Sequence, residues 1–410
     1  MKALLFCPNL EKLAAQASSK NILEEEPFDF SDLSAIRYTD LPKPEIPSEE
    51  WVRIKTSMSG ICGSDLGFIA GKVFPSMEPF SSLPFVPGHE MCGVVDQIGK
   101  EEKEFQVGDR VAIDPTLACR QRVIHPPCPP CARGDFSLCE NIDRGAVGPG
   151  ILQGVNAVTG GGWGEYFIAH RSQLLKLPDH VSDEEGFLLE PFSVSLHGVL
   201  RNRPQSEHRC LIFGCGTIGL TTIAALKGLE LGGQVIAVAK YPHQAKAARL
   251  LGADEVILPG EDDLYGRVAG LTGGRLFPLS TGKHWLEGGI DLVYDSVGNS
   301  ATLDDSLRLL RAGGKLVLLG APAFAPKVEW VPFWFREIQL VGSICYGMEE
   351  WKGKAMTTFE VALELVQKDK VNLKPLVTHH FPIDRYERAI RVAGSKSLEE
   401  VVKVAFCHTL

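Results

Sequence analysis

The sequence predicts an α/β protein with two domains, one mainly β and one built on a doubly wound parallel sheet of six strands. Its 410 residues suffice for two or three domains at roughly 150 residues each. Residues 1–205 carry short apolar runs separated by Gly and Pro, which is typical of irregular β structure. From residue 206, strand-like runs alternate with helix-like stretches, which indicates βαβ units.

In the first domain, short strands are expected at 52–60, 93–99, 110–115 and 165–170. In the second, six strands are expected at 210–214, 234–239, 255–258, 291–298, 315–320 and 338–344, with helices at 218–231, 243–252 and 301–314. The Gly-rich segment 270–289 fits neither pattern, and we interpret it as a surface insertion before the fourth strand.

The chain after about residue 345 changes character again. A helix is expected at 357–370, followed by a short β-like tail that returns to the first domain. The predicted first domain is therefore discontinuous, comprising residues 1–205 and 345–410, and the second domain comprises residues 206–344.

Composition excludes several classes of protein. The formal net charge of −9 disfavours a nucleic-acid partner, because an anionic protein repels a phosphate backbone. No apolar stretch approaches the roughly 20 residues of a membrane span, and the N-terminus lacks the features of a signal peptide. We therefore expect a cytoplasmic protein without a membrane partner, in which the acidic run at 24–26 is a solvated loop.

A glycine fingerprint opens the second domain. Gly214, Gly216 and Gly219 form G-x-G-x-x-G between a predicted strand and a predicted helix, with Cys215, Thr217 and Ile218 between them. The first Gly permits a tight turn, the second lets the backbone approach a pyrophosphate, and the third allows close helix–strand packing. The alternative is an ordinary strand–turn–helix junction, but the βαβ context favours a dinucleotide site at the helix N-terminus.

The residue expected to contact the ribose hydroxyls lies about 20 residues further on. Ala239 occupies this place, where NAD-binding domains usually have an acidic residue, and Lys240 and His243 follow it. The missing carboxylate favours NADP slightly over NAD. The alternative is that Lys240 is a solvated surface lysine.

Four of the eleven cysteines crowd into one segment, as Cys119, Cys128, Cys131 and Cys139. In a reducing compartment this spacing indicates a closed, structural zinc site rather than disulfides. The fourth ligand is ambiguous, because His125 could replace Cys119, although we favour Cys119. We expect small buried apolar side chains at Cys7, Cys92, Cys210, Cys215, Cys345 and Cys407.

A second group of possible ligands is dispersed along the first domain. Cys62 lies in S-G-I-C-G-S-D, His89 and Glu90 lie in V-P-G-H-E, and Glu190 precedes a proline. A catalytic zinc needs about three protein ligands and an open position, and these residue types meet that need. Each also has an ordinary structural role, so spacing alone does not join them.

Together these motifs resemble the zinc-dependent medium-chain dehydrogenase/reductase family, which includes alcohol and polyol dehydrogenases. The resemblance extends from about residue 50 to 405 and is carried by G-I-C-G-S-D, P-G-H-E, the Cys cluster, G-G-W-G-E-Y, E-P-F-S-V and G-C-G-T-I-G. It implies a GroES-like β domain that holds the catalytic zinc, joined to a Rossmann domain that binds NAD(P).

The resemblance also implies roles for single residues. Cys62, His89 and Glu190 match the ligands of the catalytic zinc. Glu90 matches a carboxylate beside the metal, Ser64 matches the hydroxyl that passes on the substrate proton, and Asp65 matches the carboxylate that orients the ligand histidine. The sequence departs from the family at Gly67, where a histidine ends the proton relay in the best-known members, and in the stretch R-Q-R-V-I-H-P-P within the Cys cluster.

The implied activity is reversible hydride transfer between a primary or secondary alcohol and a nicotinamide cofactor, with zinc as Lewis acid. The expected partner is a small alcohol or carbonyl substrate, and the expected assembly is a homodimer or homotetramer. Two other readings compete with this one. A zinc-free NADPH reductase of activated double bonds would lack the dispersed ligands, and a non-catalytic nucleotide-binding protein would have lost part of the site.

Overall fold

The computed structural model describes residues 1–9, 33–72, 77–100, 103–320, 325 and 327–408, so the acidic run at 24–26 lies outside the described residues. Contacts divide the chain into two compact units. Unit 1 comprises Met1–Glu190, Tyr346–Gln367 and Leu376–Leu410, and unit 2 comprises Pro191–Cys345 and Lys368–Pro375. The sequence places the boundary near residue 205, where the β/α alternation begins, whereas this division falls inside helix α5 (Asp183–Arg201).

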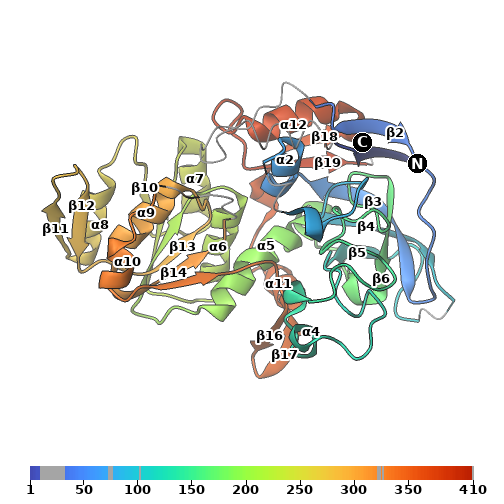
Figure 1. The fold of residues 1–410 in the computed structure, drawn as a ribbon, viewed down its shortest axis with the longest axis horizontal. Coiled ribbons are helices and arrows are strands. Elements are labelled where there is room, and N and C mark those ends of the chain that lie inside the picture. Colours follow the sequence, from blue (N-terminus) through green and yellow to red (C-terminus); the bar gives the residue numbers. More distant parts are fainter. Residues whose placement is uncertain (10–32, 73–76, 101–102, 321–324, 326, 409–410) are drawn as a thin grey trace. The chain divides into compact units, whose positions relative to one another are not determined.

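Unit 1 is built on a sheet in which seven strands are described, in the order β18-β19-β3-β4-β5-β7, with β6 paired to β3 (Figure 1). Its strands are β3 (Trp51–Gly60), β4 (Met91–Ile98), β5 (Arg110–Ile113), β6 (Tyr166–His170), β7 (Leu174–Lys176), β18 (Val377–Pro382) and β19 (Lys403–Cys407). Ile54 of β3 and Val95 of β4 are paired and buried in the sheet's core. Strand β19 pairs antiparallel with β3, so the C-terminal tail returns to the sheet begun by the N-terminal half.

The remaining elements of unit 1 surround this sheet. They are the strand pairs β1 (Lys2–Phe6) with β2 (Ile36–Asp40) and β16 (Met348–Trp351) with β17 (Lys354–Thr357), and the helices α2 (Gly63–Ile69), α4 (Pro129–Ala132), α11 (Thr358–Gln367) and α12 (Tyr386–Gly394). Short 3-10 turns occur at Glu78–Phe80, Phe136–Leu138, Arg171–Gln173 and Ile383–Arg385.

Unit 2 contains the predicted parallel sheet of six strands, in the order β10-β9-β8-β13-β14-β15. Its strands are β8 (Arg209–Phe213), β9 (Gln234–Val238), β10 (Glu255–Ile257), β13 (Ile290–Asp295), β14 (Leu310–Leu318) and β15 (Gln339–Gly342). Its helices are α6 (Thr217–Gly228), α7 (Pro242–Leu250), α8 (Leu264–Thr272), α9 (Ser300–Leu309) and α10 (Val331–Phe335). The strand order reverses between β8 and β13, which is where doubly wound sheets bind their ligands. The predicted fold class is confirmed.

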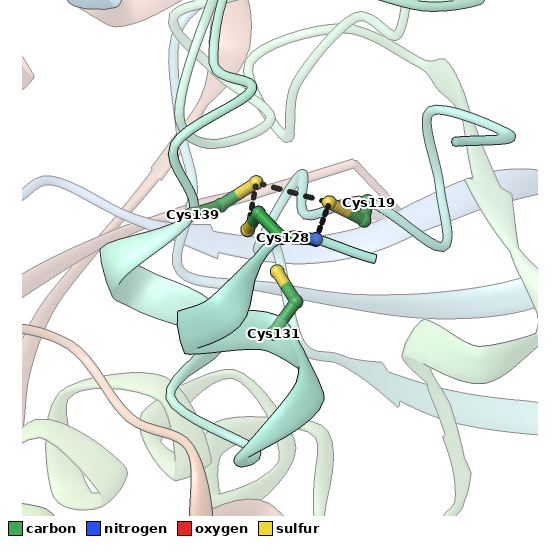
Figure 2. A group of neighbouring side chains, drawn as sticks. All are labelled: Cys119, Cys128, Cys131 and Cys139. Atoms are coloured by element: carbon green, nitrogen blue, oxygen red, sulfur yellow. Dashed lines mark hydrogen bonds between the residues drawn. The ribbon is translucent and has the colours of Figure 1, made fainter. Parts of the chain in front are cut away.

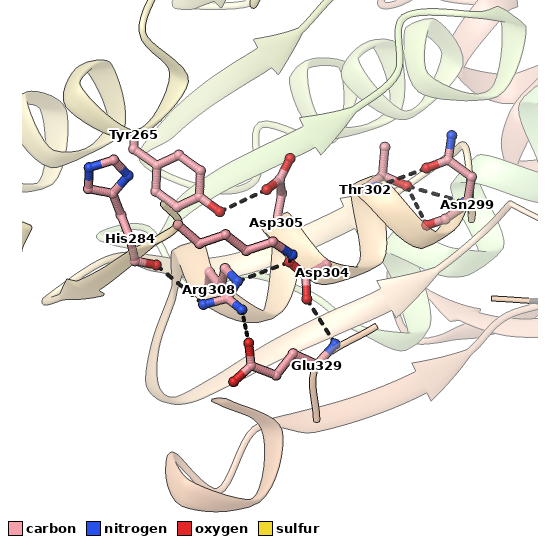
Figure 3. A network of polar contacts seen from close by, with 9 residues as sticks. Tyr265, His284, Asn299, Thr302, Asp304, Asp305, Arg308 and Glu329 are labelled. Atoms are coloured by element: carbon pink, nitrogen blue, oxygen red, sulfur yellow. Dashed lines mark hydrogen bonds and ion pairs between the residues drawn. The ribbon is translucent and has the colours of Figure 1, made fainter. Parts of the chain in front are cut away.

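The Gly-rich segment before the fourth strand forms an antiparallel hairpin of β11 (Arg275–Pro278) and β12 (His284–Glu287). It is not only a surface insertion, because Leu286 is fully buried in the core of unit 2. Buried charges on α9 also hold it in place (Figure 3). Arg308 pairs with Asp304 at 2.9 Å and with Glu329, and its guanidinium reaches the carbonyl of His284 at 3.5 Å.

Two expectations about the chain as a whole can be compared with the structure. Among the described residues, none of the helices combines the length and apolar character needed to cross a bilayer. None of the eleven cysteines forms a disulfide, and Cys92, Cys210, Cys215 and Cys407 are buried as expected. Cys7 and Cys345 are only half-buried, which corrects the expectation for these two. Cys7 follows the end of strand β1, and Cys345 lies in the segment between β15 and β16.

Candidate active site

Helix α2 positions three of the predicted site residues. Cys62 is its N-cap, and the backbone N–H of Cys62 donates to Asp65 Oδ2 at 2.8 Å. An acidic side chain in the first turn that accepts from the N-cap is a favourable helix start. In this turn Cys62 and Ser64 are half-buried, and Asp65 is buried.

His89 enters the site from the loop that precedes β4. Gly88 has φ of +92°, and a Cβ there would lie 2.3 Å from Trp163 Cδ1, so only glycine fits this turn. His89 Nδ1 lies 3.6 Å from Asp65 Oδ1, beyond hydrogen-bond length, and no partner for this atom occurs among the described residues. Burial alone would lower the pKa of His89, but Asp65 and Cys62 raise it well above its ordinary value.

The neighbouring carboxylate forms a buried ion pair that the sequence did not predict. Glu90 is 1% exposed, and both of its carboxylate oxygens accept from Lys403 Nζ, at 2.6 and 2.5 Å. Lys403 is 3% exposed and also donates to the carbonyl of Ile61 at 3.2 Å. Gly60 makes room for this pair, since a Cβ there would lie 1.9 Å from Glu90 Oε2.

Glu190 lies within helix α5 and is also buried. Its Oε1 accepts a hydrogen bond from the hydroxyl of Tyr346 at 3.2 Å. Burial and the charge of Glu90 raise the pKa of Glu190 to about 7, although His89 and Lys403 oppose this shift. The charge of Glu190 therefore interacts with the charges of His89, Glu90 and Lys403.

The structure brings the ligand atoms of Cys62, His89 and Glu90 within 4.8 Å of one another. Glu190 is not a member of this group, but it lies close enough to His89 and Glu90 to interact with their charges. A thiol, an imidazole and carboxylates are the ligand types that zinc prefers. The charges of Glu90, Cys62 and Glu190 all act on Lys403, and a divalent cation would offset the negative charge that Lys403 leaves unbalanced. The residues present therefore fit a zinc ion.

The four clustered cysteines converge in a second group (Figure 2). Their sulfur atoms lie within 4.8 Å of one another, with Cys139 Sγ 3.7 Å from Cys119 Sγ and 3.9 Å from Cys128 Sγ. Backbone N–H groups donate to these sulfurs, including that of Glu140 to Cys128 at 3.4 Å. Burial raises the pKa of Cys128, but hydrogen bonds from donors that include the backbone N–H of Glu140 outweigh this effect and lower it to about 7. The lower pKa favours the thiolate, which is the form that zinc binds.

The unusual stretch between Cys119 and Cys128 has a structural explanation. It carries Arg122, which is fully buried. The guanidinium donates to the carbonyls of Leu117 and Arg144, both at 2.9 Å, and to those of Gly148 and Gly150. The extra residues therefore fasten the cysteine cluster to the following loop.

His125, the alternative fourth ligand, is exposed and lies outside the group of four sulfurs. We expect His125→Ala to retain all bound zinc and to change the free energy of unfolding by less than about 0.5 kcal/mol, as for other surface substitutions. Metal analysis by mass spectrometry checks this, with Cys119→Ser as the control that loses one zinc ion. Loss of zinc from His125→Ala would assign the fourth ligand to the imidazole instead.

The glycine fingerprint joins β8 to α6 in unit 2. Gly214 has φ of +83°, which disfavours any other residue at the turn. A Cβ on Gly219 would lie 1.7 Å from the carbonyl oxygen of Gly214, so this glycine permits the close helix–strand approach. Gly216 is the N-cap of α6, and Thr217 and Ile218 begin the helix. The backbone N–H groups of Thr217 and Ile218 are suited to bind the anionic oxygens of a pyrophosphate.

The residues after β9 present a basic surface rather than an acidic one. Ala239 is buried, and Lys240 is exposed with its Nζ 5.6 Å from the ring centroid of Tyr241. The rings of Tyr241 and His243 are stacked with centroids 5.6 Å apart. No carboxylate occupies the position of Ala239.

Sequence reasoning missed Lys403 and Tyr346. Lys403 left one signal, because it is a single cation inside the apolar run V-V-K-V-A-F-C. A charge inside such a strand is usually paired when it is buried. Tyr346 left no signal, because its partner Glu190 lies 156 residues away.

Comparison with known proteins agrees with this geometry. Residues 48–179 match the family model of the alcohol dehydrogenase GroES-like domain, and residues 217–360 match that of the zinc-binding dehydrogenase. The L-idonate 5-dehydrogenase of Vitis vinifera is 30% identical over 357 residues, which cover 87% of this chain and 87% of that protein.

Solved structures show the same fold. The 2R,3R-butanediol dehydrogenase of Bacillus subtilis is 26% identical, with a TM-score of 0.71 over 91% of this chain and 96% of that one. An alcohol dehydrogenase from Escherichia coli CFT073, solved with NADH, is 24% identical, with a TM-score of 0.73 over 99% of each chain. The chain therefore belongs to the zinc-dependent medium-chain dehydrogenase/reductase family and is an alcohol or polyol dehydrogenase that uses zinc and a nicotinamide cofactor.

Proposed function

We propose that Cys62, His89 and Glu190 hold the catalytic zinc and that the chain oxidises a polyol or reduces the corresponding carbonyl. Two observations support this proposal. The ligand atoms of Cys62 and His89 lie within 4.8 Å of each other and of Glu90, and Glu190 is close enough to interact with the charges of His89 and Glu90. Glu90 is the carboxylate beside the metal, where Lys403 holds it. The structural zinc is held by Cys119, Cys128, Cys131 and Cys139.

The chain's own residues then have separate tasks. The charge of Asp65, whose Oδ1 lies 3.6 Å from His89 Nδ1, would orient the imidazole and leave Nε2 for the metal ion. Ser64 accepts the proton of the substrate hydroxyl as a relay member and releases its own hydroxyl proton to solvent, to which its half-exposed side chain has access. When bound, zinc lowers the pKa of an alcohol hydroxyl and the nicotinamide accepts the hydride. Residues 206–344, which lie within unit 2, would bind the nucleotide, with the pyrophosphate on the N-terminus of α6.

A substrate panel tests this proposal. The purified protein is assayed with polyols and simple alcohols, each with NAD and with NADP, and its zinc content is measured in the same samples. We expect about two zinc ions per chain and turnover that stops when a chelator removes the catalytic zinc and returns on adding zinc back. Turnover that survives complete zinc removal would contradict the proposal and favour a zinc-free reductase.

We propose that NADP is slightly favoured over NAD, because Ala239 leaves no carboxylate at the ribose position and Lys240 follows it. A contact between an exposed lysine and the 2′-phosphate is worth about 1.4 kcal/mol, which is tenfold in affinity. We expect Lys240→Ala to raise the KM for NADP about tenfold and to leave the KM for NAD unchanged. Steady-state kinetics with both cofactors checks this, with Lys246→Ala, on the following helix, as the control. Equal effects on the two cofactors would assign Lys240 to the solvated surface.

The assembly is part of the same proposal. We infer a homodimer or homotetramer without nucleic-acid partners, and the cytoplasmic location stays a prediction from the sequence. Light scattering of the purified protein measures the assembly directly, and a monomer at assay concentration would contradict this inference.

A further inference from the structure

Tyr346 is a buried tyrosine that the reaction as described above does not use. Its side chain is 1% exposed, and its hydroxyl donates to Glu190 Oε1 at 3.2 Å. A tyrosine hydroxyl that donates to a carboxylate favours the ionised form of that carboxylate and fixes its orientation. With one oxygen of Glu190 engaged in this way, Oε2 is the atom that remains for a metal ion.

The ring of Tyr346 is held firmly. It packs edge-on against Phe359 of α11, with ring centroids 4.8 Å apart and an interplanar angle of 87°. The next residue, Gly347, donates its N–H to Thr358 Oγ1 at 3.1 Å, and its carbonyl accepts from the N–H of Thr358 at 2.9 Å. The hydroxyl of Tyr346 therefore has little freedom to leave Glu190.

The backbone before Tyr346 is strained. Cys345 has φ of +51°, in the left-handed region that a residue with a Cβ seldom adopts. Such conformations persist where the surrounding contacts over-determine them, and they cluster at functional sites. The strained residue directly precedes Tyr346, whose hydroxyl contacts Glu190.

Tyr346 and Glu190 also occupy matching places in the chain. The chain leaves unit 1 after Glu190 and enters it again at Tyr346. The hydrogen bond between the two side chains therefore joins two of the points at which the polypeptide passes from one unit to the other.

We propose that Tyr346 is a positioning residue that holds the Glu190 carboxylate in place as a ligand of the catalytic zinc. This inference rests on the proposed function, because it takes Glu190 to be a metal ligand. Partners that orient metal ligands typically contribute 10- to 100-fold to metal affinity or activity, so the effect of losing the hydroxyl should be measurable.

The variant that tests this is Tyr346→Phe, which keeps the ring against Phe359 and removes only the hydroxyl. The matched control is Tyr294→Phe, because Tyr294 is equally buried and its hydroxyl donates to the carbonyl of Asn202 at 2.8 Å in unit 2. Both variants lose one buried hydroxyl, so the control accounts for a loss of stability alone.

We expect the dissociation constant of the catalytic zinc, measured by chelator competition, to rise about 10- to 100-fold in Tyr346→Phe and to stay at the wild-type value in Tyr294→Phe. The absorption bands of the cobalt-substituted protein should shift in the first variant only. The kcat should fall while the KM for the cofactor is unchanged. Wild-type zinc affinity and an unchanged cobalt spectrum in Tyr346→Phe would overturn the proposal.

Glu190→Gln separates this proposal from the proposed function. If Tyr346 acts through Glu190, the double variant should bind zinc no more weakly than Glu190→Gln alone. Weak zinc binding in Glu190→Gln together with wild-type binding in Tyr346→Phe would overturn only the role of Tyr346. Wild-type zinc affinity and turnover in Glu190→Gln would overturn the ligand assignment itself.

Discussion

Replacing Cys62 with alanine is expected to lower the zinc content from about two ions to about one per chain and to reduce turnover by about three orders of magnitude. The thiol is the ligand at the start of α2, and it lies within 4.8 Å of the ligand atoms of His89 and Glu90. A metal that polarises the substrate oxygen contributes several kcal/mol of transition-state stabilisation, and losing the metal loses that contribution.

The control for this variant is Cys210→Ala. Cys210 is buried in β8 of unit 2 and lies outside both groups of possible ligands. It should keep about two zinc ions and its turnover, although the lost side-chain contacts lower its stability. Retention of both zinc ions by Cys62→Ala would contradict the assignment, and so would wild-type turnover without the second ion.

Patterns local in the sequence predicted the architecture. The alternation of apolar runs and amphipathic stretches after residue 206 predicted all six strands of the unit 2 sheet. This was possible because each strand and helix of a βαβ unit shows its own hydrophobic periodicity within a short stretch of sequence. The glycine fingerprint was found for the same reason, since the turn at Gly214 and the close approach at Gly219 act within six residues. The spacing of the four clustered cysteines is equally local.

Contacts between distant residues could not be predicted in this way. Lys403 and Glu90 are 313 residues apart, and they meet only because β19 pairs with β3 beside the loop that carries Glu90. The hairpin of β11 and β12 was not predicted, because glycines interrupt its strand pattern in the sequence. Its packing against the rest of unit 2 depends on charges on α9. Motif resemblance supplied the dispersed zinc ligands, because spacing alone gave no reason to join Cys62 to His89.

Lys403→Met is expected to destabilise the protein by about 3–5 kcal/mol. The substitution keeps the length of the side chain but removes the only cation that contacts Glu90 among the contacts described, at 2.6 and 2.5 Å. Glu90 is 1% exposed, so its carboxylate would remain buried without a partner. Removing one member of a buried ion pair costs more than the pair itself contributes, because the remaining charge keeps its desolvation penalty.

Urea unfolding of the zinc-saturated protein measures this effect. The control is Lys352→Met, whose ion pair with Glu364 is exposed and should contribute less than about 1 kcal/mol. The double variant Lys403→Met with Glu90→Gln should recover much of the lost stability, since an amide is cheaper to bury than an unpaired carboxylate. If Lys403→Met costs no more than Lys352→Met, then the charge of Glu90 is balanced by something other than Lys403. The bound metal would be the first candidate, and Glu90 would then be a ligand in its own right.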